Sequence, residues 1–149
     1  MKGAKAVADM NIKRLVFGIC VAFVLCAFVG VSVVSARTIY VPDDYAKIQW
    51  AVDNASAGDT IVVRDGIYHE NVVVNKQLTI KSENGSKNCV VDGGGSTVFT
   101  LIADGIKIEG FTITGGYTGI AIHSNNNSIS KNIISSNIGC SIYLNSNNN

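Results

Sequence analysis

The sequence of 149 residues has few charges, and those it has are scattered. Only 15% of the residues are Asp, Glu, Lys or Arg, and the formal net charge is +1. Residues 1–36 carry a net charge of +3, whereas the other 113 residues carry 8 basic and 10 acidic groups, a net charge of −2. A nucleic-acid-binding surface needs a basic patch or stripe. The sequence has none, so we predict no nucleic-acid partner.

Carboxylates and arginines become scarce in the second half of the chain. After Asp92 the acidic residues are only Asp104 and Glu109, and no arginine follows Arg64. Glycosidic chemistry needs two carboxylates facing one groove, and lyase chemistry needs a carboxylate with an arginine. Asp104 is typical of a turn and Glu109 of an outward-facing strand residue. The sequence therefore predicts a protein that is not an enzyme.

Metal ligands are few and far apart. Copper sites collect His, Met or Cys, and after residue 36 the chain has no Met and only His69, His123, Cys89 and Cys140. None has a close spacing such as His-x-His, and no Asp-rich loop indicates calcium. We predict no metal site and no cofactor. The two cysteines could pair in an oxidising compartment or remain buried thiols.

The one long hydrophobic run lies near the N-terminus. Lys13-Arg14 precede an uncharged stretch from Leu15 to Ala36, which ends in the small residues that a signal peptidase accepts. Its apolar part, about 20 residues, is also long enough to span a bilayer. Residues 1–36 are therefore predicted to be a signal peptide or an uncleaved membrane anchor, with a buried soluble helix as a third alternative. Either of the first two places residues 37–149 outside the cell or on its surface.

Proline occurs once and glycine 15 times, a composition that favours short strands and tight turns. Residues 45–54 are the exception, because apolar side chains there follow helical spacing. The preceding Asp43 and Asp44 offer carboxylates that could cap this helix. From Thr60 onward the hydrophobic period is about two, and polar turns interrupt it at short intervals.

The C-terminal third of the chain repeats with a spacing of 21–22 residues. Ile120 matches Ile142 at a spacing of 22, and Ile108 matches Ile129 at a spacing of 21. A sandwich does not need such a period, but one coil of a parallel β-helix does, with three short strands and three corners. We predict an all-β, single-stranded parallel β-helix over residues 37–149, with about 21–22 residues per coil and regular coils over residues 98–149.

Asparagine takes the place of glycine at one of the predicted corners. Asn127, Asn132 and Asn137 are candidates for corner positions, where asparagine tolerates left-handed backbone angles and where stacked amides could form a ladder. The alternative for residues 119–149 is a disordered Asn/Ser tail. The regularly placed isoleucines argue against it as far as Leu144, and residues 145–149 are expected to fray.

Two segments resemble a known family. Thr38-Ile-Tyr-Val-Pro-Asp-Asp-Tyr-x-x-Ile-Gln-x-Ala-Val-Asp and the following Ala-Gly-Asp-Thr-Ile-Val-Val-x-Asp-Gly-x-Tyr-x-Glu-Asn are similar to the start of right-handed parallel β-helix proteins with the pectin-lyase-like fold. Archaeal surface proteins with a NosD-like β-helix region are the most similar type. The resemblance implies that the β-helix is right-handed and that residues 45–54 cap its N-terminal end. Relatives have more coils, and the stop in mid-repeat at Asn149 suggests a truncated member.

The resemblance is more specific for fold than for function. We expect a non-catalytic, structural or adhesive protein of the cell surface whose partners are surface glycans or other surface-layer proteins. Candidates for carbohydrate contact are Tyr68, Tyr117 and Tyr143, although packing within strands is the alternative for each. The same motifs also resemble the opening of pectin methylesterases, so an N-terminal fragment of a carbohydrate-active enzyme is one alternative. A NosD-like periplasmic copper-handling protein is the other.

Three acceptor sequences for N-glycosylation follow from the pattern Asn-x-Ser. They begin at Asn54, Asn84 and Asn126. Chance matches are frequent in a sequence this rich in Asn and Ser, and Asn84 is favoured because it lies in a predicted turn.

Overall fold

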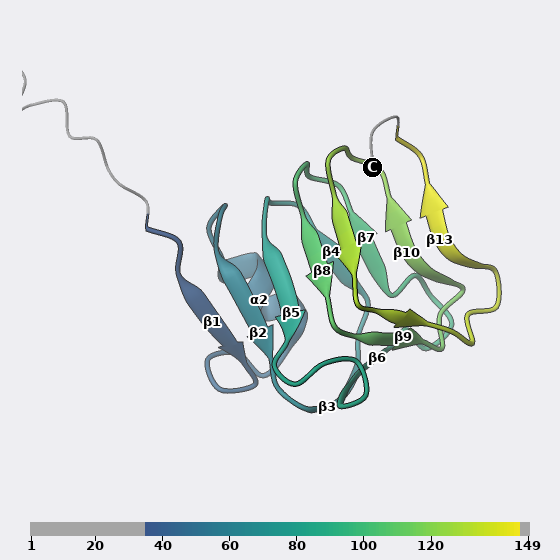
Figure 1. Ribbon diagram of the computed structural model, residues 1–149, viewed down its shortest axis with the longest axis horizontal. Helices are drawn as coiled ribbons and strands as arrows, with labels where there is room; N and C mark the ends of the chain where they lie inside the picture. The colour runs from purple at the N-terminus through teal and green to yellow at the C-terminus, as the bar shows by residue number, and fades with distance from the viewer. Residues whose placement is uncertain (1–34, 147–149) are drawn as a thin grey trace, which may run out of the picture. The chain divides into compact units, whose positions relative to one another are not determined.

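Short runs of β-branched residues form strands that stack in register, one coil upon the next. A computed structural model describes residues 35–146 (Figure 1). The described residues contain one short helix, α2 (Ile48–Asn54), and thirteen strands. The strands are β1 (Thr38–Val41), β2 (Thr60–Val63), β3 (Gly66–His69), β4 (Val72–Val74), β5 (Thr79–Ser82), β6 (Cys89–Asp92), β7 (Phe99–Leu101), β8 (Lys107–Glu109), β9 (Thr112–Thr114), β10 (Thr118–Ile122), β11 (Ser128–Ser130), β12 (Ile133–Ile134) and β13 (Cys140–Leu144).

The strands form three parallel sheets, with orders β1-β2-β5-β8-β11, β3-β6-β9-β12 and β4-β7-β10-β13. Consecutive strands along the chain belong to different sheets, so each coil contributes one strand to each sheet. Every observed strand pair is parallel. This arrangement is a parallel β-solenoid, which confirms the predicted architecture.

The core is built from ladders of like residues. In the first sheet five isoleucines pair in succession across the coils. They are Ile39, Ile61, Ile80, Ile108 and Ile129. The first four are at most 2% exposed, and Phe99 packs near Phe111 from the following coil with ring centroids 5.9 Å apart. The continuous core therefore runs along the axis of the solenoid.

The coil length changes along the chain. Thr60 pairs with Thr79, 19 residues later, whereas Thr79 pairs with Lys107, 28 residues later. The polar segments after β5 and β6 lengthen the second of these coils. In the last coils the spacing is 21 for Ile108 and Ile129 and 22 for Ile120 and Ile142. The predicted period thus holds for the C-terminal coils, and the earlier coils depart from it.

Helix α2 is shorter than the predicted residues 45–54 and is capped differently. Asp44 accepts a hydrogen bond from the backbone N–H of Tyr40 (2.7 Å), and Asp43 binds Arg64. The prediction that these two carboxylates cap the helix was wrong. Instead Glu70, from the segment after β3, accepts hydrogen bonds from the backbone N–H groups of Ile48 and Gln49 (3.0 and 3.1 Å).

Two further side chains fix α2 against the first coil. The Gln49 amide accepts from the backbone N–H of Val73 (2.7 Å) and donates to its carbonyl (3.3 Å), so it pairs with the outer edge of β4. The Lys76 ammonium donates to the carbonyls of Val52, Asp53 and Ala55 at the helix C-terminus. The helix and these side chains thereby cover an edge that would otherwise expose unpaired backbone groups.

The corners of the last two complete coils follow a second regularity. Gly105, Gly110 and Gly115 have φ of 72°, 79° and 67°, and the residues 21 positions later, Asn126, Lys131 and Ser136, have φ of 57°, 56° and 55°. The left-handed angles therefore belong to the residues immediately before Asn127, Asn132 and Asn137.

The three asparagines themselves bond to the preceding coil. Their side-chain oxygens accept from the backbone N–H groups of Ile106, Phe111 and Gly116 at 2.9, 2.8 and 3.0 Å. The amide of Asn132 also donates to the carbonyl of Ile108 (2.8 Å), and that of Asn137 to the carbonyl of Ile113 (3.2 Å). We call these three side chains the asparagine brackets. Each links a corner to the backbone one coil earlier.

The predicted signal peptide or membrane anchor, residues 1–36, lies outside the described residues except for Ser35 and Ala36. Among residues 35–146, the structure contains no helix with the length and apolar character needed to cross a membrane.

Candidate functional site

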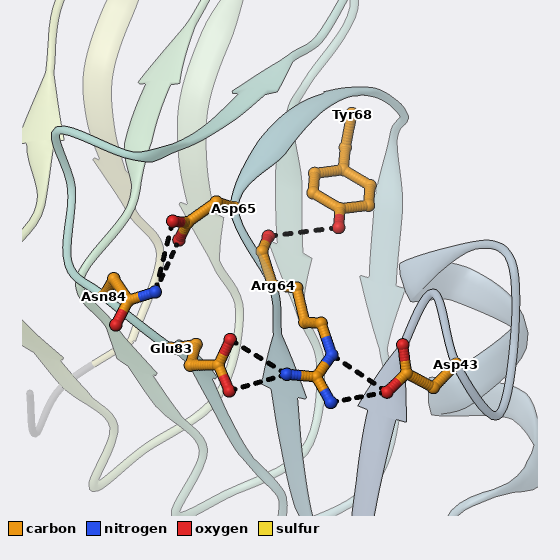
Figure 2. Close-up of polar contacts among 6 residues, drawn as sticks. All are labelled: Asp43, Arg64, Asp65, Tyr68, Glu83 and Asn84. Atoms are coloured by element: carbon orange, nitrogen blue, oxygen red, sulfur yellow. Dashed lines mark hydrogen bonds and ion pairs between the residues drawn. The ribbon is translucent and has the colours of Figure 1, made fainter.

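The densest polar constellation surrounds Arg64, at the corner that follows the first sheet (Figure 2). The guanidinium lies between two carboxylates, with Nη2 2.6 Å from Asp43 and Nη1 2.8 Å from Glu83. Its plane also lies over the ring of Tyr40, 5.2 Å from the centroid. Asp43, Arg64 and Glu83 follow β1, β2 and β5, so these contacts join three successive coils.

The electrostatics of this Arg64 cluster do not suit acid catalysis. The hydrogen bond from Arg64 holds the pKa of Asp43 below its usual range. The pKa of Arg64 is raised in turn, first by Asp43 and then by Glu83. A general acid needs a raised carboxyl pKa near the operating pH. The cluster therefore connects coils and offers no proton donor for chemistry.

Tyr68 and Asn84 border the same cluster. The Tyr68 hydroxyl donates to the carbonyl of Arg64 (3.1 Å), and its ring packs against the core. Burial raises its pKa, with smaller contributions from nearby anionic groups. The Asn84 amide donates to both oxygens of Asp65, at 3.1 and 3.2 Å. Tyr68 is thus held within the fold and does not present an open ring face.

The other two candidate tyrosines are more open. Tyr117 is 60% exposed and Tyr143 is 48% exposed. The ring of Tyr143 lies beside that of His123, with centroids 5.9 Å apart. Tyr143 is in β13 and Tyr68 in β3, which belong to different sheets. The structure therefore does not gather the three tyrosines into one site.

An exposed aromatic residue outside the predicted set is Trp50, on α2. It is 50% exposed, and the Lys47 ammonium lies 5.3 Å from its ring centroid. An open hollow of about 280 Å³ lies beside it, lined also by His69 and Asn71. Helical spacing could have identified this residue, since Ile48, Ala51 and Val52 face the core and leave position 50 to solvent.

Two carboxylates meet at a second hollow, of about 430 Å³. It is lined by Glu83 and Glu109 together with Lys81 and Lys131. Lys131 binds Glu109 at 2.5 Å and holds its pKa below the usual range, and Glu83 is bound by Arg64. Asp104 accepts from the backbone N–H of Asn125 (2.7 Å), away from this pair. The arrangement has two carboxylates but no carboxyl group with a raised pKa to act as the acid.

The histidines and cysteines do not form a ligand set. Within residues 35–146 no group of three or more His, Cys, Asp or Glu side chains could hold a metal ion. His69 lies 3.4 Å from Asp92, and both cysteines are free thiols. Cys89 is buried in the core, which raises its pKa to about 12, whereas Cys140 is exposed.

All three glycosylation candidates are exposed. Asn54 ends α2 and donates from its amide to the carbonyl of Trp50 (2.9 Å). Asn84 is held by Asp65, as described above. Asn126 occupies a left-handed corner, at φ 57°.

The motif residues shared with pectin methylesterases have structural contacts. Gln49 belongs to the Ile-Gln-x-Ala-Val-Asp segment and pairs with the edge of β4. Glu70 belongs to the Gly-x-Tyr-x-Glu segment and caps α2. Both side chains are therefore occupied by holding the N-terminal end of the solenoid together.

Comparison with known proteins gives one informative relative. The chain is 44% identical over 78 residues to a cell surface glycoprotein of Methanothermus fervidus. The match covers 51% of this chain but only 13% of the relative, so the chain spans a small part of that protein's length. No protein-family model matches the chain, and no solved structure matches it.

Proposed function

We propose that the protein is a non-catalytic, structural or adhesive β-solenoid of the cell surface that contacts carbohydrate. The observation that carries this proposal is the 44% identity to a cell surface glycoprotein. The solenoid is consistent with it, because stacked coils give long, regular surfaces suited to contacts with extended partners. The carboxylates at the hollow of Glu83 and Glu109 are both ion-paired, which supports a role without catalysis.

Location is tested on intact cells that express the full chain. Biotinylation with a reagent that does not cross membranes should label the protein, whose Lys47, Lys81, Lys87 and Lys107 side chains are available on the surface. A cytoplasmic protein expressed in the same cells serves as the control. Absence of label on intact cells, with labelling after lysis, would contradict a surface location.

Carbohydrate contact is tested by binding to a glycan array. Tyr117 and Tyr143 expose enough of their rings to stack on sugars. We expect binding to fall at least about tenfold in Tyr117→Ala or Tyr143→Ala, and to remain in Tyr68→Phe, which keeps the partly buried ring. Binding by neither the wild type nor any variant would exclude the carbohydrate part of the proposal and leave the surface location standing.

Glycosylation of this chain is part of the same proposal. Asn84 and Asn126 lie in exposed turns, and a glycan there would meet no core side chain. Mass spectrometry of the protein from an archaeal host should find glycosylated Asn-x-Ser peptides that disappear in Asn84→Gln or Asn126→Gln. Unmodified peptides at all three sequons, in a host that glycosylates a control protein, would exclude this modification.

A further inference from the structure

The last coil leaves core positions open to solvent. Ile142 pairs in register with Ile120, and Leu144 with Ile122. Ile120 and Ile122 are at most 2% exposed, whereas Ile142 is 42% and Leu144 57% exposed. The inward positions of Ile129, Ile134 and Cys140 end the stack in the same way. We call this end, formed by β11, β12 and β13, the C-terminal face.

The C-terminal face also presents unpaired strand edges. β11, β12 and β13 each end the order of their sheet within the described residues. Edge strands are usually protected by charged side chains, proline or a covering element. From Ser128 to Ser146 the only charged residue is Lys131, which binds Glu109 of the preceding coil, and there is no proline. The face therefore combines apolar side chains, open backbone groups and no free charge.

The opposite end of the solenoid is closed. Helix α2 contacts β1, β2 and β4, and the Gln49 amide occupies the edge of β4 at Val73. A C-terminal face of another copy could not stack in register on that end without displacing the helix. Self-association in a head-to-tail manner, which would give an open filament, is blocked by α2.

We infer that the C-terminal face binds the same face of a second copy, giving a closed two-fold dimer. A two-fold contact places each face against itself, and an uncharged face meets no like-charge repulsion in that arrangement. Strands related by the two-fold axis run antiparallel, so their edges can exchange backbone hydrogen bonds. Ile142 and Leu144 would be buried as Ile120 and Ile122 are now. The inference concerns a different surface from the tyrosines and does not rest on the proposed function.

The test compares the oligomeric state of the full chain and two lysine variants by sedimentation velocity from about 1 to about 100 µM. The face variant carries Ile142→Lys and Leu144→Lys. The control variant carries Ile67→Lys, at a residue of β3 that is 67% exposed and distant from β13 in the stack. All three proteins keep the same N-terminal residues, so association through that segment affects them equally.

We expect the wild type and the control to dimerise alike and the face variant to dimerise at least about tenfold more weakly. A wild type that stays monomeric, polymers that grow without limit, or a face variant that dimerises like the wild type would overturn the inference. Hydrogen exchange of the wild type gives a second measurement that needs no variant. Amides of β13 should gain protection as concentration rises, and unchanged exchange there would also overturn it.

Discussion

The two ends of the solenoid are made from similar strands but completed by different means. At the N-terminal end, α2, Gln49, Glu70 and Lys76 cover the first coil through contacts between residues 21 to 24 positions apart. At the C-terminal end, the asparagine brackets join the last coil to the one before it, and nothing among the described residues covers the last coil. One end is closed by specific side chains, and the other repeats a pattern that could accept another layer.

This difference shows how a stacked fold divides specificity from repetition. The N-terminal contacts are unique and occur once, so they define where the stack begins. The brackets recur at 21-residue spacing with the same geometry, and each stabilises only its neighbouring coil. Variants at the two ends should therefore affect stability to different extents.

The largest effect is expected in the isoleucine ladder. Ile80 is fully buried between coils, and Ile80→Ala should lower the free energy of unfolding by about 2–5 kcal/mol, because it leaves a cavity. Ile142→Ala, at the open end, should cost less than about 1 kcal/mol in the monomer, because the side chain is already 42% exposed. Urea unfolding at low protein concentration measures both. Equal losses would show that the last coil is as well packed as the interior.

The next effect tests the N-terminal cap. Glu70→Ala removes the acceptor of two backbone N–H groups of α2 and should lower the free energy of unfolding by about 2–3 kcal/mol, the range for hydrogen bonds to a charged group. Glu83→Ala is the matched control, because it removes a partly exposed surface ion pair and should cost no more than about 1 kcal/mol. A Glu70→Ala protein as stable as the control would mean that α2 is held by its apolar face alone.

The pH dependence of the N-terminal end follows from Asp59, which is 2% exposed. The backbone N–H groups of Ser56 and Arg37 hold its pKa below the usual value. The folded state thus binds this proton less readily than the unfolded chain. Stability is then fully present above the unfolded pKa of about 4 and is lost as the pH falls through the lower folded pKa.

Asp59→Asn should remove that part of the acid dependence and cost about 1–3 kcal/mol at neutral pH. Unfolding by urea at several pH values between about 2 and about 7 measures both effects. Some acid dependence should remain, because the pKa values of Asp43 and Glu109 are lowered as well. A variant with the same pH profile as the wild type would exclude Asp59 as a source of acid sensitivity.

The brackets should show a smaller effect. Asn132→Ala leaves the Phe111 N–H without its acceptor at 2.8 Å and the Ile108 carbonyl without its donor. We expect a loss of about 1–2 kcal/mol and faster hydrogen exchange of the Phe111 amide. Asn88→Ala is the control, since its amide makes an exposed local contact with Asn84. Unchanged exchange at Phe111 would show that the bracket contributes nothing to the corner.

The repeated part of the fold was predictable from sequence because its signals are periodic. The isoleucines of β8, β10, β11 and β13 occur at the spacing of one coil, and the structure pairs them in the predicted register. The helix at residues 45–54 was found with its first residues misplaced. Its cap could not be predicted, because Glu70 is 22 residues from Ile48 and acts across the fold, whereas Asp43 and Asp44 only lie near it in the sequence.

The candidate site was less accessible from sequence for a related reason. Whether a tyrosine is open depends on its strand position and its neighbours, and these separate Tyr68, held by the Arg64 carbonyl, from Tyr117 and Tyr143. Trp50 was overlooked although the helical period leaves it on the outer face. The pairing of Glu83 with Arg64 depends on the 19-residue first spacing, which departs from the repeat and so could not be extrapolated.

The smallest effect is a gain in stability at a left-handed corner. Ser136 has φ 55°, where the preceding coil has Gly115 at φ 67°. A non-glycine residue in this region costs about 1 kcal/mol or more, and glycine recovers part of that cost while losing entropy in the unfolded chain. Ser136→Gly should therefore raise the free energy of unfolding by about 0.5–1 kcal/mol, and Ser135→Gly, at a neighbour without positive φ, should lower it. The reverse change, Gly110→Ala, should destabilise, because a Cβ there would lie 2.5 Å from the Ser82 Oγ. If Ser136→Gly is neutral or destabilising, the last coil does not carry backbone strain, and its corner is as well accommodated with serine as the earlier corners are with glycine.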